Sequence, residues 1–497
     1  MNRDASEKLP RSFAAVIAAA IALCMSACAV PLAPGYRIEK ETVELSFADQ
    51  PKPLLHLRGR YHLANIGNAP LTSLELTVPE KDFLGRQNLR VTVDGKDAQI
   101  TEHLPDEHLT ETAQIAFEPA WRPHETREIE IACDLTAGFG SETMMAPDAF
   151  VFDGGYWFPT LHAPNRIFAK GEQRADPTDL SIVLPRDFLA IASGQRTGRK
   201  IHGETVEYRF RLRAKDGAAF VVAGRYKQQV AKSKGTAVYF WTFQGSSDDA
   251  VKSAGDEIAA AAQFFDNDFA ARAKTKSPVW VAEIPEHQVF NMSDLVVNPR
   301  QSFPNGILLD NVNLRKNIGR GQVSGSEVSL LADTWIRWMA SPKDGEPMLQ
   351  DTLGPYMVDA FNESREGAPY RDKKIAEHLR QYDQSHSRAE EKPIAQTTSN
   401  GSNQADQLNM AVNKASLFLY ALEDVCKPAV VRRGIGTMLS NLRGSEYGYE
   451  DLRAAVSIEC GRTAETDALF RAWLYEKGIP AEFRARYSNV AAAKVVK

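Results

Sequence analysis

The chain has 497 residues, of which 43% are hydrophobic and 25% are charged. This length exceeds one ordinary core, so two or three domains are expected, and the composition is that of a soluble globular protein. The formal net charge of -5, without a marked basic run, argues against binding nucleic acid through a general basic surface.

Residues 1–27 predict a sorting signal rather than part of the fold. A positive start is followed by an alanine-rich apolar run, Phe13 to Met25, which is too short to be a good membrane span. Small residues then precede Cys28, a pattern that resembles the lipobox of bacterial lipoproteins, in which the signal is cut before the Cys and the Cys is lipidated. The alternative is a plain secretory signal that is cut elsewhere. Either signal exports the body of the protein.

The lipobox reading predicts where the exported protein is held. Acyl chains on Cys28 would anchor it to a membrane without a transmembrane helix. Ala29 follows the Cys, and no Asp stands there of the kind that retains lipoproteins at the inner membrane. We therefore predict a cell-envelope protein, lipid-anchored at the outer membrane and facing the periplasm.

Cysteine usage leaves one pairing open. If Cys28 carries lipid, three cysteines remain in the mature chain, so at least one is unpaired or joins another chain. Cys426 and Cys460 both lie in the predicted C-terminal helical region, where an oxidising compartment would let them form a disulfide. Two buried thiols are the equally open alternative.

Residues 28–229 predict an all-β domain. Apolar residues alternate with a period of two, and no long helical periodicity interrupts them. The pattern is seen at Val43, Leu45 and Phe47, at Leu74, Leu76 and Val78, and at Ile129, Ile131 and Cys133. We expect a sandwich or a saddle that uses both faces of its sheets.

Residues 230–485 predict a mainly helical second domain, which makes the whole chain an α+β multidomain protein. Strands are expected over 236–243 and 279–284, a helix over 248–269, and mostly helices after residue 324. Residues 363–407 are polar and poor in large apolar residues, which predicts a flexible surface loop. Residues 486–497 are expected to form a C-terminal tail.

Several segments, in order, resemble the alanyl aminopeptidase family of zinc peptidases, the gluzincins that include leukotriene hydrolase. They are Tyr156-Trp-Phe-Pro159, Leu180-Ser-Ile-Val-Leu-Pro185, Ala192-Ser-Gly194, Phe220-Val-Val-Ala-Gly-Arg-Tyr226 and Leu469-Phe-Arg-Ala-Trp-Leu-Tyr-Glu-Lys-Gly-Ile-Pro480. The resemblance spans most of residues 40–485 and implies a β domain followed by a thermolysin-like, mainly helical gluzincin domain.

The zinc motif of that family is altered here. The family places H-E-x-x-H on a helix, where two His bind zinc and the Glu is the general base, and a third ligand, a Glu, follows about one helix later. In this chain Ser329 and Asp333 stand at the two His positions, and Leu330 stands at the base. Trp335 matches the family's Trp after the motif, which favours this register over one that would use Glu327. Asp351 resembles the third ligand but lies one residue short of the usual spacing.

Two further features of the family's site are changed. Val412 stands where the family has the Tyr that steadies the oxyanion, and losing one oxyanion donor typically costs about 10²–10³ in rate. The family's exopeptidase loop, whose Glu holds the substrate amine, corresponds in position to residues 300–306, which contain no acidic residue. Asp333 and Asp351 could bind a hard cation weakly, but solvated or arginine-paired carboxylates are the interpretation we favour. We therefore expect no catalytic residue, no metal and no other cofactor.

Three functions are compatible with this pattern. The first, which we favour, is a catalytically inactive, membrane-anchored protein that binds a peptide or protein partner or acts as a scaffold. The second is an active metallo-aminopeptidase with an altered metal site, against which Leu330 argues because its side chain cannot accept a proton. The third is a structural subunit of an envelope assembly. Fold alone does not choose among them, because function depends on the site.

Overall fold

The computed structural model describes most of residues 35–492. The residues between these bounds that it leaves undescribed are 50–51, 80, 82–84, 104–110, 137–142, 153–156, 158–159, 162–174, 214–218, 270–277, 285–290, 293–294, 297–300, 304–305, 311–324, 337–339, 344–345, 347, 398–404 and 444. Cys28 and the predicted signal therefore lie outside the described residues. No described helix combines the length and the apolar character that a membrane span requires.

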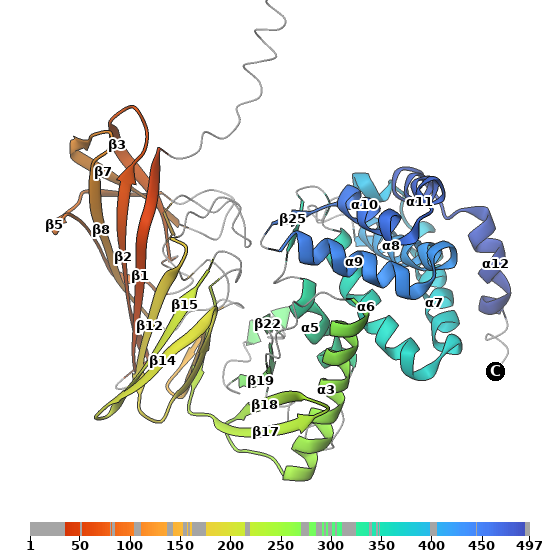
Figure 1. Ribbon diagram of the computed structural model, residues 1–497, viewed down its shortest axis with the longest axis horizontal. Helices are drawn as coiled ribbons and strands as arrows, with labels where there is room; N and C mark the ends of the chain where they lie inside the picture. The colour runs from red at the N-terminus through yellow and green to blue at the C-terminus, as the bar shows by residue number, and fades with distance from the viewer. Residues whose placement is uncertain are drawn as a thin grey trace, which may run out of the picture.

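The N-terminal domain is built on one long eight-stranded sheet (Figure 1). In spatial order its strands are β14 (Gln195–His202), β15 (Thr205–Leu212), β12 (Thr178–Pro185), β1 (Tyr36–Ala48), β2 (Leu54–Asn65), β8 (Thr126–Leu135), β4 (Gln87–Val93) and β5 (Lys96–Asp97). The predicted alternation is confirmed, because Val43, Leu45 and Phe47 are buried while the residues between them are exposed or half-buried.

Two four-stranded sheets complete this domain. One has the order β13 (Leu189–Ala192), β16 (Val221–Gly224), β10 (Ala149–Phe152), β9 (Thr143–Ala146), and the other β11 (Thr160–Leu161), β3 (Leu71–Val78), β7 (Glu111–Trp121), β6 (Ile100–His103). Each contributes apolar side chains to its own core together with the long sheet: Phe150 and Phe152 pack with Leu45, while Leu76 and Ile115 pack with side chains of β2 and β8. The predicted all-β sandwich is thereby confirmed.

A smaller five-stranded sheet follows. Its order is β17 (Lys227–Ser233), β18 (Thr236–Thr242), β19 (Val279–Ile284), β23 (Gly306–Asp310), β22 (Gln301–Phe303), with two short hairpin strands, β20 (Asn291–Met292) and β21 (Leu295–Val296), between β19 and β22 in the chain. The five-stranded sheet begins at Lys227 with β17, so the domain boundary predicted after residue 229 falls inside this strand. The face bearing Trp241 packs against Val151 and Val222 of the N-terminal domain.

Helices form the rest of the molecule (Figure 1). They are α3 (Asp248–Asp268), α5 (Gly325–Ile336), α6 (Met348–Glu366), α7 (Ala368–His386), the 3-10 turn η3 (Ile394–Gln396), α8 (Ala405–Cys426), α9 (Pro428–Asn441), α10 (Tyr449–Cys460), α11 (Thr463–Phe470), the π-helical turn η4 (Arg471–Tyr475) and α12 (Ala481–Ala492). The short strands β24 (Ser341–Pro342) and β25 (Glu446–Tyr447) pair beside them. An extended apolar core joins these helices to the inner face of the five-stranded sheet.

Two predicted irregular segments are helical instead. Most of residues 363–407, predicted as a flexible loop, lies in the end of α6 and in α7. The buried side chains of α7, Ile375, Leu379, Tyr382 and Ser385, recur at helical spacing, and the remaining face is polar, so few large apolar residues were visible in the sequence. The predicted tail from residue 486 is also partly wrong, because α12 runs to Ala492.

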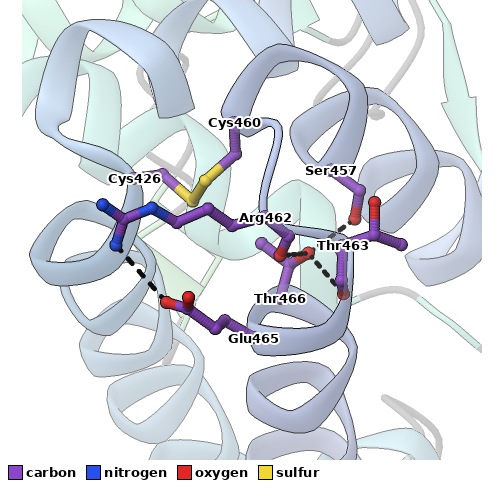
Figure 2. Close-up of a disulfide and its surroundings, with 7 residues drawn as sticks. All are labelled: Cys426, Ser457, Cys460, Arg462, Thr463, Glu465 and Thr466. Carbon is purple, nitrogen blue, oxygen red and sulfur yellow. Dashed lines mark hydrogen bonds and ion pairs between the residues drawn. A yellow bond between two sulfur atoms is a disulfide. The ribbon is translucent and has the colours of Figure 1, made fainter.

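A disulfide joins the ends of two helices. Cys426, the last residue of α8, is bonded to Cys460, the last residue of α10, and their Cα atoms are 5.2 Å apart (Figure 2). The bond lies beside the turn into α11, where Thr466 donates to the carbonyl of Arg462. Of the two alternatives left open by the sequence, the structure contains the bonded pair.

Removing this disulfide is expected to lower the free energy of unfolding by about 3–4 kcal/mol, because it closes a long loop, with a sequence separation of 34 residues, in the unfolded chain. Urea unfolding of the Cys426→Ser/Cys460→Ser double variant against the wild type measures the effect. Dithiothreitol should destabilise the wild type and leave the double variant unchanged. Equal unfolding midpoints for the two oxidised proteins would show that the bond does not stabilise the fold.

Candidate functional site

The altered zinc motif lies on α5, which contacts β22 and β23 at one edge of the five-stranded sheet. Ser329, Leu330 and Asp333 are all half-buried there. The Leu330 side chain packs against the helical core. It has no polar group that could act as a base. Asp333 lies against α6, because a Cβ built on Gly354 would be only 2.8 Å from its Oδ1.

The position of the third ligand is occupied by a residue that the sequence prediction missed. Asp351 is exposed on the first turn of α6, whereas its neighbour Thr352 is only 1% exposed. One residue turns the side chain by about 100° around a helix, so only one of the two can face the interior. The usual family spacing also leads to Thr352, since Asp351 was one residue short. A buried hydroxyl therefore stands where the family has a carboxylate.

Val412 lies on α8 and is half-buried against the same helical core. Residues 301–303 of the altered exopeptidase segment form β22, the outer strand of the five-stranded sheet, which pairs antiparallel with β23. The structure therefore brings the α5 motif and the edge strand β22 side by side.

The residues at these positions do not fit a catalytic zinc. Such a site needs three protein ligands from Cys, His or carboxylate, and a base for the bound water. Here the ligand positions hold Ser329, Asp333 and Thr352, and the base position holds a leucine that packs against the core. Within the described ranges no three His, Cys, Asp or Glu side chains lie close enough together to hold a metal ion.

A buried charge network holds the helices around this region. Arg432 of α9 donates to Asp268 at 3.1 Å and Glu363 at 2.9 Å, and lies 3.7 Å from Glu423. The hydroxyl of Tyr356 donates to Oε1 of Glu423 at 2.7 Å. Burial raises the pKa of the Glu423 carboxyl above its ordinary value. These contacts join α3, α6, α8 and α9.

Arg371 of α7 extends the network to the C-terminal helix. It donates to Glu423 at 3.2 Å, to Asp424 at 2.8 Å and to the hydroxyl of Tyr487 in α12 at 2.9 Å. Burial opposes its charge, but the bonds to Tyr487 and the two carboxylates raise the pKa of Arg371. No short sequence motif could predict this network, because its members come from six helices.

A second polar cluster surrounds Asp359 of α6, two turns beyond the altered ligand position. Tyr370 and Tyr420 donate to its carboxylate at 2.9 and 3.1 Å, and His378 Nε2 lies 3.8 Å away. The other nitrogen of His378 is 2.9 Å from Oδ1 of Asn413, the residue next to Val412. Asn413 Nδ2 donates to the carbonyl of Asn409, so Oδ1 accepts from His378 Nδ1. These contacts link α6, α7 and α8, and they leave the buried Nε2 of His378 without a hydrogen bond to any described residue.

Lys414 of α8 forms an enclosed ion pair. Its side chain is 1% exposed, and Nζ lies 2.9 Å from Oε1 of Glu391, which is 4% exposed. Tyr382 and the backbone of Gly478 also donate to Glu391. Burial lowers the pKa of Lys414, and although burial opposes the charge of Glu391, the donors lower the pKa of its carboxyl. This pair fixes the segment after α7 against α8 and the end of η4.

Comparison with known proteins identifies the fold. No protein-family model and no curated protein matches the sequence. The M1 zinc metallopeptidase from Deinococcus radiodurans matches with a TM-score of 0.60 at 13% identity, over 90% of this chain and 96% of that one. A mutant of that enzyme bound to a Tyr-Ser-Ala substrate matches with a TM-score of 0.58 at 14% identity, over 90% and 96% of the two chains.

A second group of solved structures agrees. Native leukotriene A4 hydrolase from Saccharomyces cerevisiae matches with a TM-score of 0.62 at 13% identity, over 92% of this chain and 70% of that one. Similarity at this identity shows the fold, and it confirms the resemblance and the fold class predicted from the sequence. The chain has the fold of the M1 zinc metallopeptidases and of leukotriene A4 hydrolase: an N-terminal β domain followed by a mainly helical domain.

Proposed function

We propose that the protein is an exported, lipid-anchored member of this fold that binds an extended peptide or protein segment without cleaving it. The observation that carries the proposal is the packing of Leu330 and Val412. These residues stand where the family has its base and its oxyanion donor, and both are half-buried apolar side chains that pack against the helical core. Such a site lacks the groups that would activate water and stabilise the developing charge.

The edge of the five-stranded sheet supports the binding part of the proposal. In the described part of the chain β22 is the outer strand and pairs only with β23, so its other edge can take up an extended chain by strand addition. A structure of the same fold is known with a Tyr-Ser-Ala peptide as substrate. A peptide bound along β22 would lie beside the half-buried face of α5.

The expected result for residues 29–497, purified without chelator, is a substoichiometric zinc content and no hydrolysis of aminoacyl substrates above background. Elemental analysis and a chromogenic aminopeptidase assay measure the two, with an active zinc aminopeptidase as the positive control. The same preparation should remain inactive after zinc is added. Stoichiometric zinc together with turnover would refute the inactive site and favour the altered metallo-aminopeptidase.

Binding is tested by site-specific photo-crosslinking in the cell envelope. A photoreactive residue in place of Ser302 in β22 should capture a peptide or protein segment. The same residue in place of Val230, which is 39% exposed on β17 at the opposite edge of the sheet, is the matched control. Equal capture at both positions, or capture only at Val230, would contradict binding at β22 and favour a structural role in an assembly.

A further inference from the structure

One end of the β domain is a rigid pair of turns around Gly35, the first described residue. The backbone N–H groups of Ile66 and Gly67 both donate to the Gly35 carbonyl, at 2.8 and 2.9 Å. Asn65, which is 1% exposed, donates from Nδ2 to the carbonyls of Ala69 and Trp121. The turn after β2 and the turn after β7 are therefore tied to each other and to the start of β1.

The two turns present few charged side chains. We call residues 66–70 and 122–125 the tether end, and its charged or titratable side chains are Arg122, His124 and Glu125. Arg122 and Glu125 lie 4.0 Å apart, with their side chains 77% and 45% exposed, and Ile66 is 50% exposed. An exposed aliphatic residue beside a turn whose opposite charges lie together suits the interfacial region of a bilayer.

The chain fixes how far this surface can lie from the lipid anchor proposed above, on which this inference rests. Six residues, 29–34, separate Cys28 from Gly35. Fully extended, the seven steps span at most about 25 Å. The opposite end of the domain is much farther away, because β1 runs from Tyr36, which pairs with Asn65, to Ala48, beside the turn between β14 and β15.

We propose that the tether end lies against the membrane that holds Cys28, with Ile66 at the level of the lipid headgroups. The β domain then contacts the bilayer through the tether end. The turn between β14 and β15, with Ile201 near the end of β14, points away from the membrane. The short tether, the exposed Ile66 and the hydrogen bonds that hold the turns together favour one orientation over free rotation about the anchor.

Two exposed isoleucines make a matched pair of probe sites. Ile66 is 50% exposed at the tether end, and Ile201 is 45% exposed in β14 near the opposite end. Roughly eleven strand residues separate the two levels, which is about 35 Å. Each is replaced by Cys in the full lipidated protein and labelled with a nitrobenzoxadiazole dye. Cys133, the free cysteine among the described residues, should not react, because burial raises its pKa to about 12.

The labelled proteins are reconstituted in phosphatidylethanolamine–phosphatidylglycerol vesicles that contain spin-labelled lipid headgroups. The Ile66→Cys dye should shift to the blue and lose most of its emission by quenching, whereas the Ile201→Cys dye should keep its aqueous spectrum. Thermal unfolding checks that both variants fold, and mass spectrometry checks the acyl group on Cys28.

Each other outcome rejects a different part of the model. An acylated protein whose two dyes behave alike would overturn the membrane-facing end and leave the anchor standing. A protein without acyl groups that stays in solution would overturn both. Shielding of the Ile66→Cys dye in native membranes but not in protein-free vesicles would assign this end to a protein partner and overturn lipid contact.

Discussion

A Gly436→Ala variant is expected to lose most of its folded population. Gly436 lies in the middle of α9, and a Cβ built there would be 1.1 Å from the carbonyl oxygen of Phe269 and 2.2 Å from its carbonyl carbon. The obstacle is backbone at the end of α3, so no side-chain rotation can relieve it. Overpacking usually costs about 1–3 kcal/mol, and a backbone clash of this depth should exceed about 4 kcal/mol.

The matched control is the next residue of the same helix. Thr437→Ala removes a half-buried methyl group and a long hydroxyl contact of 3.5 Å to Glu459, and it should change the unfolding free energy by less than about 1 kcal/mol. Both changes leave an alanine on α9, so helix propensity favours both variants over the wild type. Urea unfolding and the yield of soluble protein measure the difference. A Gly436→Ala protein as stable as the control would mean that α9 does not approach α3 this closely.

The extent of the β domain could be predicted because its signal is local. Strands covered on one face alternate by two, and residues such as Ile129, Ile131 and Cys133 report their burial through their spacing alone. The long helix α3 was equally visible. α7 was not, because its interior contacts come from a narrow stripe of four residues on an otherwise charged helix. A helix with a narrow apolar stripe contains few apolar residues, although these residues still recur at helical spacing.

The candidate site was predictable only in part. The altered motif on α5 could be placed, because a short motif retains its spacing even when its chemistry is lost, whereas the edge strand β22 was not predicted. The carboxylate of Asp351 suggested the third ligand in the sequence, yet the structure buries its neighbour Thr352 and exposes Asp351. The type of side chain pointed to Asp351, but the position of a residue around the helix determines which side chain faces inward, and that residue is Thr352.

Long-range ion pairs could not be predicted at all. Arg432 meets partners that lie 164 and 69 residues away along the chain, at Asp268 and Glu363. A buried arginine on an amphipathic helix has the same local sequence signature as an exposed one. Arg432 and Arg433 are neighbours with opposite environments, since their side chains are 9% and 50% exposed. That contrast makes the pair a direct test of the network.

Arg432→Met is expected to lower the free energy of unfolding at neutral pH by about 3–5 kcal/mol, because it removes a buried cation that three carboxylates share and leaves Arg371 as the cation bonded to the buried Glu423. Asp268, Glu363 and Glu423 all lie within 4 Å of its guanidinium. Arg433→Met is the control. It removes one exposed pair with Glu459 at 3.4 Å, which is worth less than about 1 kcal/mol. Comparable losses in the two variants would show that the network does not stabilise the fold.

The difference in unfolding free energy between Arg432→Met and the wild type should become smaller as the pH is lowered, and thermodynamic linkage gives the direction of this change. Burial already raises the pKa of Glu423 in the folded protein, and losing Arg432 raises it further. A carboxyl whose pKa is higher folded than unfolded binds protons more readily in the folded state, so its contribution is favourable below the unfolded pKa and is lost as the pH rises through the folded value. Unfolding free energies of the variant and the wild type should therefore converge between neutral pH and about pH 4. A constant difference across this range would mean that the loss comes from packing of the arginine side chain and not from its charge.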